Sequence, residues 1–71
     1  MIITPIQTEK LLNTNITFSL LSFSMLITRL KVIYEKDSSS ENLQNCANEI
    51  NAFLQKYGVI MERDCVTISK L

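Results

Sequence analysis

The sequence predicts an all-α fold: an antiparallel helical hairpin, with a long helix over about residues 5–36, a second over about 39–57, and a short C-terminal tail. Apolar residues recur at intervals of three and four over most of the chain, which is the period of an amphipathic helix. A short polar run, Asp37 to Ser40, separates the two periodic segments and indicates a turn. A β-hairpin in the first segment would need a turn near residues 22–24, where no Gly, Asn, Asp or Pro is present. We expect one small domain over residues 1–71.

The first helix has a clear start signal. Thr4 is a suitable N-cap, Pro5 suits the first helical position, and Gln7 completes a capping box. Three poor helix formers at residues 13–15 predict a kink or a fresh helix start in the middle of this segment. Around that point one face stays apolar for more than six turns: Leu12, Ile16, Leu20, Phe23, Ile27, Leu30 and Tyr34.

The second helix has the cleanest periodicity in the chain. Ser38 and Glu41 match a capping box, with Asp37 and Ser40 as alternative caps. Gly58, the only glycine, stands where a left-handed C-terminal cap is expected. The apolar face of this helix consists of Leu43, Cys46, Ala47, Ile50, Phe53, Leu54 and Tyr57.

Two parts of the fold stay open. The β-branched and aromatic content of residues 16–34 keeps a small α+β fold as the alternative. In the tail, residues 59–71, the segment 65–68 favours a short strand that would pair with residues 1–4. A helix fits the same tail, because Met61, Cys65, Ile68 and Leu71 have helical spacing.

Composition argues against several function classes. Seven Lys and Arg residues balance seven Asp and Glu residues without a basic patch, which disfavours nucleic acid as a partner. The chain has no His, no Gly-rich phosphate loop and no Gly-x-Ser-x-Gly, so we predict no catalytic residue, no metal site and no cofactor. Cys46 and Cys65 are expected to be reduced, buried thiols in a cytoplasmic protein, with a single disulfide as the alternative.

The feature that bears on function is a second apolar line on the long helix, roughly opposite the first, formed at seven-residue intervals by Leu11, Phe18, Met25 and Val32. A chain of this size hides only about 60% of its unfolded surface, and a single second helix cannot cover both faces. We predict that the second face binds another helical protein, or a second copy of this chain in a structural or regulatory bundle. The predicted partner-binding residues are Leu11, Phe18, Leu21, Met25 and Val32.

The second apolar line has two competing interpretations. In the first, its residues belong to the core and are covered by the N-terminal segment or the tail. In the second, the uncharged stretch from Leu11 to Thr28 and the basic residues after it form a small single-span membrane protein. Eight of those eighteen residues are Asn, Ser or Thr, which disfavours a span.

The overall form resembles the small co-chaperones of bacterial type III secretion needle subunits. The resemblance covers residues 5–57 and rests on a length near seventy residues, apolar helices over 12–34 and 43–57, and the polar turn at 37–40. It implies a cytoplasmic, non-enzymatic protein that binds a larger helical-repeat chaperone and helps to keep a needle subunit soluble before export. It is a likeness of form and carries no individual residue role.

Overall fold

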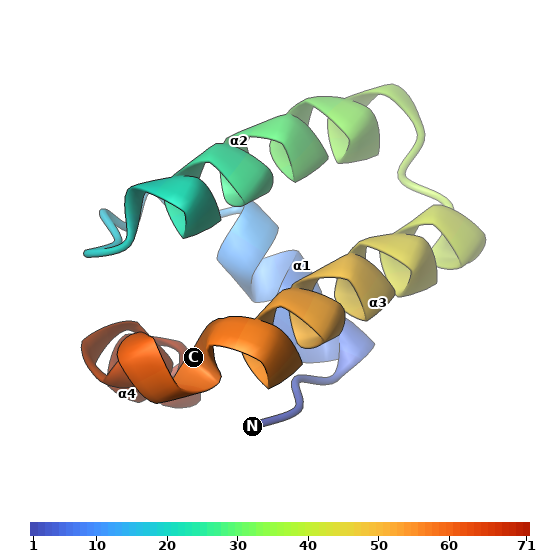
Figure 1. Ribbon diagram of the computed structural model, residues 1–71. Helices are drawn as coiled ribbons and strands as arrows, with labels where there is room; N and C mark the ends of the chain where they lie inside the picture. The colour runs from blue at the N-terminus through green and yellow to red at the C-terminus, as the bar shows by residue number, and fades with distance from the viewer.

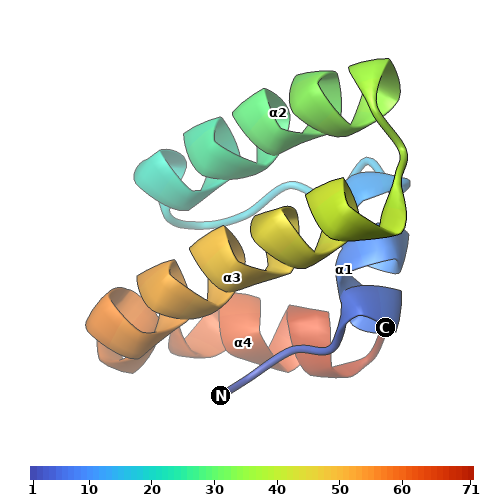
Figure 2. The same cartoon turned by 90° about the vertical axis from the view of Figure 1, so that its right-hand side faces the viewer.

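Every regular element of the structure is a helix and none is a strand, so the predicted all-α class is confirmed and the α+β alternative is wrong. The computed structural model describes residues 1–71. In Figures 1 and 2, α2 and α3 run in opposite directions, α1 crosses them, and α4 lies on the side of α3 away from α2. The elements are α1 (Pro5–Leu12), α2 (Leu21–Lys36), α3 (Ser40–Tyr57), the 3₁₀ helix η1 (Gly58–Ile60) and α4 (Glu62–Ser69).

Helix α1 begins as predicted and ends much earlier than predicted. The Thr4 hydroxyl accepts from the backbone N–H of Gln7 at 3.2 Å, and the Gln7 side chain accepts from the Thr4 N–H at 2.9 Å, so the capping box is confirmed. The helix stops at Leu12, and residues 13–20 are not helical. A single long helix over 5–36 is therefore wrong: the predicted kink at 13–15 is the start of an eight-residue break.

Helix α2 has no local cap, and a distant residue supplies one. Its N-cap residue, Leu20, makes no side-chain capping bond. Instead the Asp64 carboxylate of α4 accepts from the backbone N–H groups of Ser19, at 2.7 Å, and of Leu20, at 3.1 Å. Asp64 is only 2% exposed. This contact spans 44 and 45 residues of sequence, which explains why no local motif announces the start of α2.

Helix α3 matches its predicted range to within one residue. Its cap is Ser39, whose hydroxyl accepts from the backbone N–H of Asn42 at 3.1 Å. The predicted caps at Ser38, Asp37 and Ser40 are therefore wrong by one or two positions, within a run of residues that are all good caps.

The predicted left-handed cap at Gly58 is also wrong. Gly58 has φ −55° and ψ −33°, in the right-handed helical region, and the chain continues from it into η1. The tail that the sequence left open then forms α4, so the strand option for residues 65–68 is wrong. The helix that fits the spacing of the tail is therefore the correct option, and two of its spaced residues, Met61 and Ile68, are buried.

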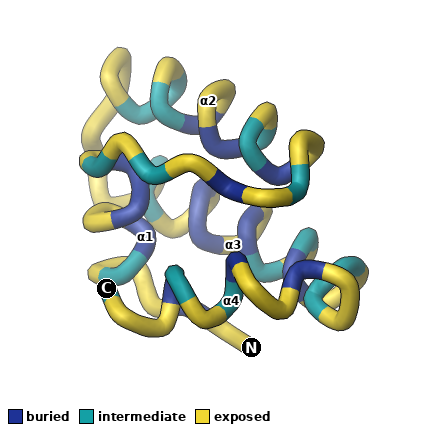
Figure 3. The backbone as a smooth tube through the Cα atoms, turned by 90° about the vertical axis from the view of Figure 1, so that its left-hand side faces the viewer, coloured by how far each residue is buried: buried dark blue, intermediate teal, exposed yellow.

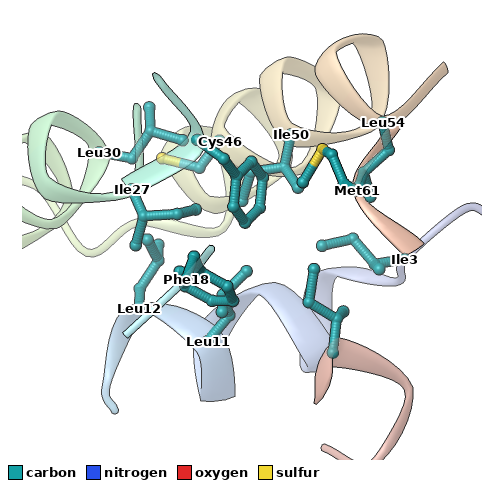
Figure 4. Packing of buried hydrophobic residues seen from close by; sticks show 12 residues of the cluster. Ile3, Leu11, Leu12, Phe18, Ile27, Leu30, Cys46, Ile50, Leu54 and Met61 are labelled. Atoms are coloured by element: carbon teal, nitrogen blue, oxygen red, sulfur yellow. The ribbon is translucent and has the colours of Figure 1, made fainter. Parts of the chain in front are cut away.

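The hydrophobic core is one cluster, with members from all four α-helices, from the loop between α1 and α2, and from the N-terminal segment. Phe23 is completely buried between two other rings, 4.8 Å from Phe18 and 5.4 Å from Phe53 between centroids. Figure 4 shows Leu11 and Phe18 within this cluster, beside Leu12 and below Ile27 of α2 in that view. The loop between α1 and α2 is therefore held by its own aromatic side chain.

The N-terminal segment is attached to α3 by one amide side chain. The Asn51 Oδ1 atom accepts from the Ile3 N–H at 2.7 Å, and its Nδ2 atom donates to the Ile3 carbonyl at 3.0 Å. The Ile3 side chain is buried in the core. Asn51 thus satisfies both backbone groups of the one residue of this segment that is buried and that belongs to no helix.

Replacing Asn51 with Ala should release this segment while leaving the helices in place. Two hydrogen bonds are lost and two backbone groups are left unpaired, for an expected destabilisation of about 1–2 kcal/mol. The Ile3 amide proton should exchange with solvent faster than in the unsubstituted chain, which hydrogen exchange measures. Asn45→Ala, at an exposed position of the same helix, is the control. Unchanged exchange at Ile3 would show that its hydrophobic burial alone holds the segment.

Candidate protein-binding surface

The outer side of α2 carries a line of side chains that nothing in the chain covers. Leu21, Met25, Thr28 and Val32, hereafter the α2 stripe, are spaced by four, three and four residues and therefore share one side of the helix. Leu21 is 72% exposed, Met25 64% and Val32 48%. Figure 3 shows exposed turns of α2 on the outside of the molecule and buried turns facing the other helices.

The opposite side of α2 is fixed in the core. Phe23, Ile27 and Leu30 are buried, and at 3.6 residues per turn they point roughly 180° away from the α2 stripe. The stripe and its neighbours Ser24 and Arg29 line a shallow, open depression. A regular helix with a firmly packed back thus presents a pre-formed apolar ridge to solvent.

The structure separates the five residues predicted to bind a partner. Leu21, Met25 and Val32 are exposed and lie together on α2. Leu11 and Phe18 are only 1% and 7% exposed and lie in the core, so their prediction as surface contacts is wrong. The reason is the break at residues 13–20, which removes both from the register of α2 and turns Phe18 back against Phe23.

Basic side chains border the α2 stripe. The Arg29 guanidinium forms an ion pair with Glu49 of α3, at 2.7 Å between Nη2 and Oε1, with both side chains about half exposed. The Lys31 ammonium donates to the Thr14 carbonyl at 2.6 Å. Lys36 lies in the last turn. Against these three cations the helix has one acidic residue, Glu35, so α2 is positively charged within a neutral chain.

A second exposed apolar surface was not predicted. Ile2 and Val59 are almost fully exposed, and with Met1 they lie at the rim of an open groove whose other walls come from α3 and α4. In Figure 2 the N-terminus and α4, which line this groove together with α3, lie on the side of α3 away from α2. Val59 lies in the 3₁₀ turn at residues 58–60. The sequence predicts a helix cap at Gly58 and therefore does not indicate this turn.

The two cysteines differ in burial. Both thiols are free; Cys46 is buried and Cys65 is half-buried, so the prediction of two buried thiols holds fully only for Cys46. Burial, and secondarily the negative charge of Glu49, raises the pKa of the Cys46 thiol, which favours its neutral form. No group of three His, Cys, Asp or Glu side chains is placed to hold a metal ion.

One tyrosine also has a shifted pKa. The Tyr34 hydroxyl donates to the Glu9 carboxylate at 2.6 Å, joining α2 to α1. This hydrogen bond is the main cause that raises the pKa of Tyr34. The proton therefore stays on the phenol at neutral pH, and the contact is structural.

No helix in the structure combines the length and the apolar content needed to cross a bilayer. The uncharged stretch from Leu11 to Thr28 is divided between the end of α1, the loop and the first half of α2.

No protein-family model, curated protein or solved structure matches the chain. The α2 surface is therefore interpreted from its own chemistry.

Proposed function

We propose that this protein is a non-enzymatic, cytoplasmic binding module that docks a helix of another protein on the α2 stripe, as a small chaperone or adaptor. The observation that carries the proposal is the exposure of Leu21, Met25 and Val32 on a helix whose opposite face is anchored in the core. An apolar helix face of this kind packs against another helix by the same ridge geometry that builds helical cores. Met25, with its flexible thioether, adapts to more than one partner surface.

The size of the stripe suits a modest affinity. Burying one apolar side chain completely contributes about 1.5–3 kcal/mol. Since the three side chains are between half and three quarters exposed, their burial contributes about 3–5 kcal/mol from this side. Association itself costs about 4–15 kcal/mol. The partner must therefore add apolar side chains of its own, and the complex is expected to be reversible, as an adaptor or chaperone requires.

A homo-oligomeric bundle is the alternative, because the same stripe can pack against a second copy. A role in a type III secretion chaperone system stays a prediction from overall form. That form has two helices, whereas the structure has four, so the proposed docking depends on the α2 stripe alone. The proposed cytoplasmic location agrees with two free thiols, which persist in a reducing compartment.

Met25→Ser is expected to abolish partner binding without unfolding the domain. The substitution replaces the centre of the stripe with a polar group, while the buried face of α2 is unchanged. Affinity capture from the native host, followed by mass spectrometry, should show proteins held by the natural chain and lost with Met25→Ser.

Val66→Ser is the matched control, because Val66 is a half-exposed apolar residue on α4, away from α2. This variant should retain the captured proteins. Circular dichroism checks that both variants keep their helicity. If the same proteins bind all three chains equally, the α2 stripe is not the docking surface.

A further inference from the structure

We propose that the α2 stripe selects an amphipathic helix with acidic residues along the edge of its apolar seam, in preference to a basic helix or a second copy of this chain. This inference rests on the proposed function and specifies the chemistry of the partner. It follows from the charges that border the stripe.

The spacing of the α2 stripe shows which other residues of α2 would lie beside a helix that docks along the stripe. Intervals of four, three and four residues are those of alternating core positions in a heptad repeat. Side chains next to such a seam contact the flanking residues of the partner helix and determine partner choice. On α2, Arg29 and Lys36 flank the seam on one side, seven residues and thus about 10 Å apart. Lys31 flanks it on the other.

These cations remain able to bind a carboxylate. Arg29 uses one nitrogen for Glu49 and its side chain is 54% exposed, and a guanidinium has five N–H donors. Lys36 is exposed at the end of the helix. A docked helix with Glu residues seven apart would place one carboxylate near each of the two.

A second copy of this chain does not supply those carboxylates. If two α2 helices packed in parallel, Lys31 would face Lys36 of the other copy. If they packed antiparallel with the stripes aligned, Arg29 and Lys31 would face the hydroxyls of Ser22 and Ser24. In neither orientation does a carboxylate of the second α2 helix face Arg29 or Lys31. The charge pattern therefore favours a different, acidic helix.

Two synthetic three-heptad peptides test the inference directly. Both have Leu at every core position; one has Glu and the other Lys at every flanking position, so that like charges keep each peptide from pairing with itself. Fluorescence anisotropy against the full chain at about 50 mM salt should show at least about tenfold tighter binding of the Glu peptide. The preference should shrink in about 0.3 M salt, because these charges are exposed.

Charge reversal on the protein is the complementary test. Lys36→Glu should weaken binding of the Glu peptide several-fold. Lys70→Glu, the same change of charge at the end of α4, should leave it unchanged. If both variants weaken binding of the Glu peptide equally, the binding depends only on the net charge of the chain and not on the position of Lys36. That result would overturn the inference.

The remaining outcomes separate this inference from the proposed function. Equal binding of both peptides, lost in each case with Met25→Ser, would overturn the charge selection and support the docking surface. Self-association in sedimentation equilibrium that is lost with Met25→Ser, without peptide binding, would make a second copy the occupant and also overturn it. A monomer that binds neither peptide would contradict the proposed function itself.

Discussion

Asp64→Ala is expected to lower the free energy of unfolding by about 3–4 kcal/mol, because it removes the only acceptor of two backbone N–H groups at the start of α2. Hydrogen bonds to an ionised carboxylate are stronger than neutral ones, and the donors left behind have no local replacement. A domain of this length has a total stability of roughly 4–10 kcal/mol. The loss therefore removes a large part of the total, and urea unfolding followed by circular dichroism measures it.

The effect should depend on the position of the carboxylate and not on the charge alone. Glu62→Ala removes an acidic residue from the same first turn of α4, but its side chain is exposed and makes no such contact; we expect a loss below about 1 kcal/mol. Asp64→Asn keeps one acceptor oxygen, so its loss of stability should be smaller than that of Asp64→Ala and larger than that of Glu62→Ala. If Asp64→Ala and Glu62→Ala are equally stable, Asp64 contributes little and the loop between α1 and α2 is held by its other contacts, the Phe18 ring and the Lys31–Thr14 hydrogen bond.

Phe18→Ser should destabilise the domain by about 3–5 kcal/mol, as for other losses of a buried aromatic ring. The ring is 7% exposed and contacts Phe23 edge to face, with 4.8 Å between centroids. Without it, the loop loses its anchor and the core keeps a cavity beside Phe23. The measurement is the midpoint and slope of urea unfolding.

Met25→Ser is the informative comparison, because Phe18 and Met25 stand seven residues apart and belong to the same predicted line. Since Met25 is 64% exposed, its replacement should change stability by less than about 1 kcal/mol. Phe18→Ser is then expected to destabilise the domain strongly, and Met25→Ser is expected to leave its stability nearly unchanged. Equal destabilisation by both would indicate that α2 and the loop form one continuous helix in solution.

Local signals in the sequence identified the start of α1, the end of α2 and both ends of α3 to within one residue. The capping box of Thr4 and Gln7 depends on residues three apart, and α3 depends on its own periodicity and a run of hydroxyl caps, so both were predictable. The weak stretch at residues 13–15 predicted an interruption at the right place, where α1 ends, but the next helix starts only at Leu21 and not at residues 13–15. The length of the break was not predictable, because it is decided by the burial of Phe18 against Phe23 and by the distant Asp64 carboxylate.

The same distinction holds for the exposed apolar face of α2. Leu21, Met25 and Val32 were predicted because their spacing lies within one uninterrupted helix. Leu11 and Phe18 were placed with them by extending that helix through residues 13–20. A seven-residue interval indicates a shared face only where the backbone between the residues is helical, so the break moved both into the core.

The sequence by itself determined the helical class, the start of α1, the range of α3 and the amphipathic character of α2, because these depend on contacts within a few turns. Only the tertiary structure decided which residues of the second apolar line lie in the core and which lie on the surface. That choice depends on groups 44 to 48 residues apart, Asp64 on the start of α2 and Asn51 on Ile3. These contacts close the core around Leu11 and Phe18 and leave Leu21, Met25 and Val32 as the uncovered apolar ridge of the molecule.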